Sequence, residues 1–259
     1  MTLRRCLVTS LIAAAVLPNG VRALASEVRQ VSDAIQRYET DRDTWQRAPD
    51  VLRALGLRAG AVVADVGAGG GFFTVKLSRA VGPSGEVHAV DINPTSVQKL
   101  KERFASEHLV NVKVVQGTAD NPGLPSASLD GVLISDTYHE MVEHQAMLRA
   151  VRSALKPTGR LVILEKTAPA DSGAPRDVQI KIHHIESRLV AQELVDAGFD
   201  VVERVEQFAT NPAKYGGGVW WLMVAVPTGG DLVGQPNIQM EPTTLARSRV
   251  PAVAAHLNR

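Results

Sequence analysis

Short apolar runs alternate along most of the chain with segments in which apolar residues recur at every third or fourth position. Runs of four to eight residues are typical of buried strands, and the longer recurrence is typical of amphipathic helices. The runs predict strands at residues 61–64, 86–91, 111–116, 129–135, 160–165, 200–208 and 219–226. The recurrences predict helices at residues 26–38, 49–57, 95–107, 141–155 and 180–197, and a helix that begins at residue 72. The 259 residues are enough for one α/β domain with a well-buried core.

A glycine-rich turn joins the first strand to the helix that follows it. Asp65 stands at the end of the strand, and the turn reads Val-Gly-Ala-Gly-Gly-Gly from residue 66. Glycine adopts positive φ without strain, and its lack of a Cβ atom lets a ligand approach the backbone closely. A dinucleotide site would need a third glycine where Phe72 stands, so the spacing disfavours NAD. Two readings of the turn remain: a site for another adenosine-containing cofactor, or a tight surface turn without a ligand.

Acidic residues follow the next two strands. Asp91 ends the second strand, roughly twenty residues beyond the glycines, where a carboxylate can accept hydrogen bonds from both hydroxyls of a ribose. Asp120 follows the third strand and can accept a hydrogen bond from an adenine amino group. An ordinary turn aspartate is an equal alternative for Asp120.

The first 25 residues differ in composition from the rest. Arg4 and Arg5 precede an apolar stretch of 12 residues, and residues 23–25 have the small-x-small form of a cleavage site. This order is typical of a secretory signal peptide, and the stretch is shorter than the roughly 20 residues that span a bilayer. We therefore expect an exported protein, periplasmic or secreted, without a membrane span once residues 1–25 are removed. The alternative is a cytoplasmic protein. Cleavage would also remove Cys6, the only cysteine, and with it any catalytic thiol.

The other end of the chain also changes character. Residues 228–259 contain several prolines and glycines and little apolar periodicity, which predicts a mostly disordered tail. The expected organisation is a signal peptide at 1–25, N-terminal helices at 26–57, a cofactor-binding domain at 58–227 and the tail. The chain has 28 basic and 27 acidic residues without a basic run, so we expect no nucleic-acid partner.

Six segments together resemble the class I S-adenosylmethionine-dependent methyltransferases, especially the quinone-biosynthesis type and its relatives that act on small molecules. In the order and spacing of that family, the chain contains VADVGAGGGFFT, VHAVD, GTADNPGLP, LDGVLISDTYHEM, LKPTGRLVILE and AGFDVVE. The resemblance covers about residues 45–226. It implies a three-layer α/β/α Rossmann-like fold with a seven-stranded sheet, mostly parallel with the last strand antiparallel. It also implies S-adenosylmethionine as the cofactor.

The resemblance further implies which residues hold the cofactor. For the methionine part they are Asp65, Gly67, Ala68, Gly69 and Asp136. For the ribose and the adenine they are Asp91, Ile92, Ala119 and Asp120.

Four side chains are candidates for the group that takes a proton from the methyl acceptor. Tyr138, His139 and Glu140 follow the fourth strand, and His184 is expected across the cleft. His139 with Glu140 would deprotonate a hydroxyl or an activated carbon acid; the alternative is that Tyr138 and His139 only shape the pocket floor. Glu165, at the end of the fifth strand, can also face the substrate. His139, Glu165, His183 and His184 could suggest a metal site, but their spacing matches no familiar ligand pattern, so we expect no metal.

The sequence therefore predicts in-line methyl transfer from S-adenosylmethionine to a small-molecule acceptor. Trp45, Tyr215, Trp220 and Trp221 favour a hydrophobic or aromatic acceptor, and Trp45 either caps the cofactor pocket or lies in the core. Because S-adenosylmethionine is made in the cytosol, export favours one rival reading, a non-catalytic binding protein that keeps the fold. An NAD-dependent oxidoreductase is a second rival, which Phe72 disfavours.

Overall fold

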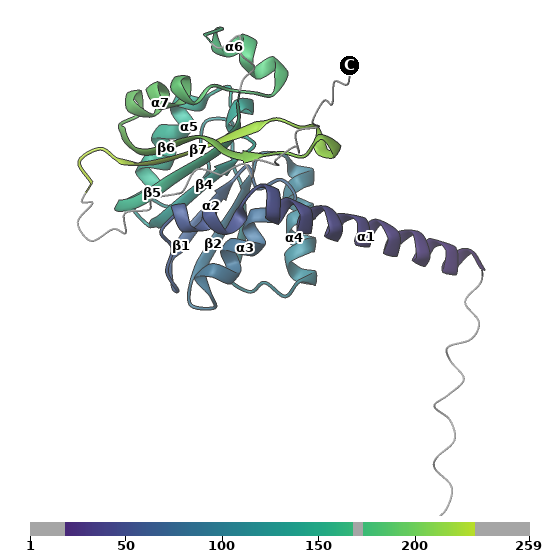
Figure 1. Ribbon diagram of the computed structural model, residues 1–259. Helices are drawn as coiled ribbons and strands as arrows, with labels where there is room; N and C mark the ends of the chain where they lie inside the picture. The colour runs from purple at the N-terminus through teal and green to yellow at the C-terminus, as the bar shows by residue number, and fades with distance from the viewer. Residues whose placement is uncertain (1–18, 168–172, 231–259) are drawn as a thin grey trace, which may run out of the picture. The chain divides into compact units, whose positions relative to one another are not determined.

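The computed structural model describes residues 19–167 and 173–230, and a seven-stranded sheet forms its centre (Figure 1). The strands lie in the order β3-β2-β1-β4-β5-β7-β6. Their bounds are β1 (Val62–Val66), β2 (Glu86–Asp91), β3 (Val112–Gln116), β4 (Leu129–Ser135), β5 (Leu155–Lys166), β6 (Phe199–Thr210) and β7 (Val219–Pro227). Strands β1 to β5 pair in parallel, whereas β7 runs antiparallel to both β5 and β6. The sheet confirms the fold that the sequence predicts.

Helices cover both faces of this sheet (Figure 1). On one face lie α2 (Ala48–Ala54), α3 (Phe72–Val81) and α4 (Pro94–Ser106), and on the other lie α5 (His144–Ala154) and α7 (Ser187–Asp196). The central strands β1 and β4 are almost wholly buried, as expected for parallel strands covered on both faces. Their apolar side chains fill two clusters, one on each side, which hold the helices against the sheet.

The parallel arrangement brings the carboxyl ends of five strands to one edge of the sheet. The residues at these ends are Val66, Asp91, Gln116, Ser135 and Lys166. In open α/β sheets, ligands bind in the crevice outside these carboxyl ends. The turns that follow the strands therefore form the candidate site.

Three short 3-10 helices and one short α-helix complete the second half of the chain. They are η1 (Tyr138–Glu140), α6 (Arg176–Gln179), η2 (Ile180–Ile182) and η3 (Ala213–Tyr215). The sequence predicts one helix over residues 180–197, but the structure interrupts it. His183 adopts a left-handed backbone conformation with φ 54°, and regular α-helix resumes only at Ser187.

The chain divides into two units, residues 1–44 and residues 45–259, which we describe separately. Most of the first unit's described part is α1 (Asn19–Trp45), which includes the predicted helix at 26–38. Helix α1 also passes through the cleavage site predicted at residues 23–25, while residues 1–18 lie outside the described part. Within the described residues, no helix has the length and apolar content that crossing a membrane requires. The predicted tail also lies outside them beyond residue 230.

Candidate active site at the carboxyl ends of the strands

The glycine turn after β1 is held by backbone hydrogen bonds and close packing. The N–H groups of Gly67 and Ala68 both donate to the carbonyl of Val90, at 2.9 Å. Gly67 has φ 78°, and a Cβ atom there would overlap the side chain of Thr137. Gly69 also has a positive φ, 54°, but a Cβ atom there would meet nothing within 4 Å. The turn is therefore packed on one side and open on the other.

Asp65 lies beneath this turn rather than at its surface. The residue is 3% exposed, and its Oδ2 accepts a hydrogen bond from Thr74 Oγ1 at 2.6 Å. Since Thr74 lies in the first turn of α3, this bond fixes the helix to the end of β1. The predicted contact of Asp65 with the methionine part of the cofactor stays a prediction.

Asp91 closes the other side of the turn. Its Oδ2 accepts from the N–H of Gly69 at 3.0 Å, and its Oδ1 accepts from the N–H of Asn93 at 2.9 Å. Asn93 in turn caps α4 by accepting from the N–H of Thr95. The neighbouring Ile92 is 56% exposed, which is unusual for isoleucine. The carboxylate is thus rigidly oriented beside an uncovered apolar side chain, a combination that suits a ribose and a planar base.

The turn after β3 carries the two residues predicted to frame an adenine. Ala119 and Asp120 are both exposed. Thr118 donates its hydroxyl hydrogen to Asp120 Oδ1 at 2.6 Å, and the N–H of Gly117 donates to the backbone carbonyl of Asp91 at 3.1 Å. The structure therefore brings this turn next to Asp91, as the prediction for the adenine edge requires.

The end of β4 contributes a strained aspartate. Asp136 has φ 56°, and its Oδ1 lies 3.0 Å from Lys166 Nζ at the end of β5. Thr137, the next residue, places its Oγ1 3.3 Å from the carbonyl of Gly67. Asp136 therefore lies beside the glycine turn; its predicted place at the methionine end of the cofactor stays a prediction.

A buried carboxylate orients the residues that follow. Glu165 is fully buried, and its Oε1 accepts from the N–H of Tyr138 at 2.6 Å. Its Oε2 lies 2.9 Å from Nδ1 of His139, which is 3% exposed. Burial alone would lower the pKa of His139, but the hydrogen bond and charge of Glu165, with the charges of Asp136 and Glu140, hold that pKa above its usual value.

The far nitrogen of His139 faces a second histidine. Nε2 of His139 lies 3.4 Å from Nδ1 of His183, and the two rings meet edge to face with centroids 5.4 Å apart. Glu140 Oε1 lies 3.8 Å from the same Nε2. The 44 positions between His139 and His183 hide this contact from any spacing rule.

His184 and Tyr138, both predicted as catalytic, have different surroundings. Nδ1 of His184 is buried without a hydrogen-bond partner among the described residues, and burial, then the charge of Lys166, lowers its pKa. The hydroxyl of Tyr138 donates to Glu193 Oε2 at 2.6 Å in the interior. Burial and the charge of Glu193 raise the pKa of Tyr138 far above its usual value. These contacts favour a structural role for Tyr138.

Trp45 is partly buried and packs against the core. Its ring centroid lies 5.6 Å from that of Trp220, and it packs against the apolar cluster to which α2 and α3 contribute.

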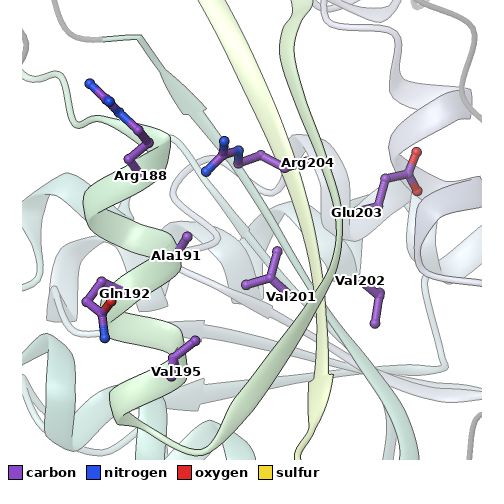
Figure 2. A pocket seen from close by; sticks show the side chains of 8 residues that line it. All are labelled: Arg188, Ala191, Gln192, Val195, Val201, Val202, Glu203 and Arg204. Atoms are coloured by element: carbon purple, nitrogen blue, oxygen red, sulfur yellow. The ribbon is translucent and has the colours of Figure 1, made fainter.

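A separate open groove of about 370 Å³ lies between α7 and the edge strand β6 (Figure 2). Its lining residues come from those two elements alone, and none of the predicted site residues is among them.

Similarity to known proteins agrees with this geometry. A family model described as a methyltransferase domain matches residues 63–159, from β1 into β5. The ubiquinone/menaquinone biosynthesis C-methyltransferase UbiE of Pasteurella multocida is 39% identical over 126 residues, which are 48% of this chain and 46% of that protein. A demethylmenaquinone methyltransferase of Staphylococcus aureus is 35% identical over 125 residues, 48% of this chain and 50% of that protein. The chain thus spans about half the length of the curated relatives it matches.

A solved structure extends the similarity over more of the chain. The crystal structure of a SAM-dependent methyltransferase from Aquifex aeolicus matches with a TM-score of 0.61 and 27% identity. The match covers 76% of this chain and 98% of that one. The predicted fold is confirmed, and the similarity to a SAM-dependent methyltransferase supports S-adenosylmethionine as the cofactor.

Proposed function

We infer that this chain transfers a methyl group from S-adenosylmethionine to a small-molecule acceptor. The inference starts from its similarity to the class I S-adenosylmethionine-dependent methyltransferases. One observation carries the inference most directly. Asp91 is held by the N–H groups of Gly69 and Asn93 at the end of β2, beside an open glycine turn. A carboxylate fixed there accepts hydrogen bonds from ribose hydroxyls, and the absent Cβ of Gly69 leaves room for the methionine part.

The residues fit S-adenosylmethionine better than a dinucleotide. The third glycine of a dinucleotide site lets the helix approach the strand closely. Phe72 stands at that position and is 5% exposed, so its ring already fills the space between α3 and the sheet. The geometry therefore disfavours the oxidoreductase alternative.

The cofactor supplies a methyl group that its sulfonium already makes electrophilic, so the chain's own task is largely one of position. Well-aligned reactants can gain about 7–11 kcal/mol from fixed geometry in the best model systems. We assign the methionine end of the cofactor, and with it the acceptor, to the side where Asp136, His139 and His183 lie. The names of the curated relatives describe C-methylation of quinone precursors; a small acceptor of the present chain is consistent with that class.

Calorimetric titration of the chain with S-adenosylmethionine, S-adenosylhomocysteine and NAD tests the proposal. We expect both sulfur compounds to bind and NAD not to bind. Asp91→Ala should weaken the binding of each sulfur compound by about tenfold or more, because the two hydrogen bonds from the ribose hydroxyls to the carboxylate are lost. The matched control is Asp196→Ala, an exposed aspartate at the end of α7 that should leave the affinity unchanged. Failure of the wild-type chain to bind either sulfur compound would contradict the proposal.

A screen of acceptors then separates an enzyme from a binding protein. Formation of S-adenosylhomocysteine, dependent on an added small molecule, is the expected result. Tight cofactor binding without turnover of any small-molecule class would instead favour the exported binding protein. Turnover confined to protein or nucleic-acid acceptors would contradict the proposed substrate class.

A further inference from the structure

Three side chains around the predicted acceptor side present ligand atoms to a common point. His139, Glu140 and His183 each offer one ligand atom, and these three atoms all lie within 4.8 Å of one another. We propose that these three residues bind a divalent transition-metal ion of the zinc class. The spacing of these residues along the sequence predicts no metal, and that prediction stays untested. The reason to propose a metal is the arrangement of the side chains in the folded chain.

The distances suit such an ion. Zinc binds imidazole nitrogen at about 2.0–2.1 Å, and two ligands at tetrahedral angles are then about 3.4 Å apart. The two histidine nitrogens are 3.4 Å apart, and Glu140 Oε1 lies 3.8 Å from Nε2 of His139. Two imidazoles and one carboxylate are a common donor set for zinc and its neighbours among the divalent metals. Three protein ligands leave one position open for a small molecule.

A buried carboxylate fixes His139 in the form that a metal requires. In the neutral His139 ring, Nδ1–H donates to Glu165 Oε2, and this tautomer leaves the lone pair on Nε2, which faces His183; a metal ion that binds there displaces the proton that the imidazolium carries on Nε2. Glu165 is itself held by the N–H of Tyr138. Histidines that bind metals almost always donate their other N–H to such a partner. Glu165 is therefore a positioning residue for this site.

The local charges also favour a cation. The carboxylates of Asp136, Glu140 and Glu165 lie around His139. Two cations lie nearby and have carboxylate partners of their own: Lys166 pairs with Asp136, and Arg176 pairs with Glu193. The alternative for the two histidines is a simple hydrogen bond between their rings. A bound metal and a ring-to-ring hydrogen bond differ in one direct respect: only the metal site binds an added ion tightly and stoichiometrically.

The consequence for catalysis rests on the proposed function. An ion at this point would bind an oxygen atom of the acceptor and lower the pKa of a hydroxyl there, with the proton passing to water. The oxygen would then attack the methyl carbon, the carbon–sulfur bond would break, and its electron pair would stay on sulfur. The acceptor class that the site favours is therefore a small molecule with an acidic hydroxyl group.

Cobalt(II) titration of the full chain, purified without a histidine tag and without cofactor, tests the site. We expect one ion per chain and the visible absorption bands of a four-coordinate cobalt site, which added zinc abolishes by displacement. His183→Gln should weaken cobalt binding by at least tenfold. His183 is exposed, so this variant should fold normally. His139→Gln should have the same effect, and Glu165→Gln should weaken binding by about 10–100-fold.

The matched control is His108→Gln, which changes an exposed histidine in the turn before β3. Binding that survives His183→Gln, or that falls equally in His108→Gln, would overturn the metal site, as would a wild-type chain that binds no cobalt. Titration with S-adenosylhomocysteine separates the two proposals. Cofactor binding without cobalt binding removes only the metal site, whereas cobalt binding without cofactor binding removes only the methyltransferase function.

Discussion

At the scale of single residues, Gly67 and Gly69 have different roles in the same turn: Gly67 permits close packing, and Gly69 leaves space open. Both have positive φ, but a Cβ atom at Gly67 would overlap Thr137, whereas one at Gly69 meets open space. We expect Gly67→Ala to lower the free energy of unfolding by about 2–4 kcal/mol, because backbone strain and a steric overlap add. Gly69→Ala should cost only about 1 kcal/mol of stability, from strain alone. Urea unfolding measures both values.

The loss of cofactor affinity should be larger for Gly69→Ala than for Gly67→Ala, the reverse of their order in stability. The space beside Gly69 is where the proposed cofactor lies, so Gly69→Ala should weaken S-adenosylhomocysteine binding although the chain stays folded. Replacing Thr137 by Ala in the Gly67→Ala background should restore part of the lost stability, since the two atoms closest to the new Cβ are removed. Equal stability losses for the two glycine variants would contradict this division of roles.

At the scale of elements, Glu193 ties α7 to three other segments. Its side chain accepts from the hydroxyl of Tyr138 in η1 at 2.6 Å and from Arg176 in α6 at 3.3 Å, and it lies 3.3 Å from His144 Nε2 in α5. We expect Glu193→Ala to lower the free energy of unfolding by about 3 kcal/mol, because it leaves a mostly buried arginine and a buried phenol without their partner.

The control for Glu193 is its exposed neighbour. Gln192→Ala, on the outer side of α7, should change stability by less than about 0.5 kcal/mol. Both variants should keep their affinity for S-adenosylhomocysteine, because the residues predicted for ribose and adenine follow β2 and β3. A loss below about 1 kcal/mol for Glu193→Ala would show that the network contributes little.

The contacts of Glu193 could not be predicted from the sequence, whereas the residues at the strand ends could. The sequence predicts Asp65, Gly67, Gly69 and Asp91 as site residues because each stands at or just after a strand end, which a run of apolar residues locates. Glu193 and Tyr138 are 55 positions apart, and no local pattern connects them. The start of α7 at Ser187 is missed for another reason. The apolar spacing continues through His183 and therefore does not reveal the interruption. The left-handed backbone of His183 depends on tertiary contacts, which the local sequence pattern does not contain.

At the scale of the whole molecule, the described apolar core lies entirely within the second unit. Among the residues whose side-chain burial is described, the buried apolar core runs from Ala48 to Val226. We therefore expect a chain that begins at Trp45 to keep its melting temperature within about 2 °C of the full chain. S-adenosylhomocysteine at 100 times its dissociation constant should stabilise both chains equally, by about 2.7 kcal/mol. Calorimetric melting with and without ligand measures both quantities.

A deeper truncation provides the control for this prediction. A chain that begins at residue 56 lacks α2 and with it Ala48, Val51, Ala54 and Leu55, all at most 2% exposed. It should lose several kcal/mol of stability, because the apolar side chains of α3 and β5 that pack against α2 would be uncovered and each buried apolar side chain contributes about 1.5–3 kcal/mol. If the chain from Trp45 lost as much as the chain from residue 56, residues 1–44 would be part of the folded unit. Because only the first of these truncations should leave cofactor binding intact, the pair also locates the N-terminal boundary of the methyltransferase domain.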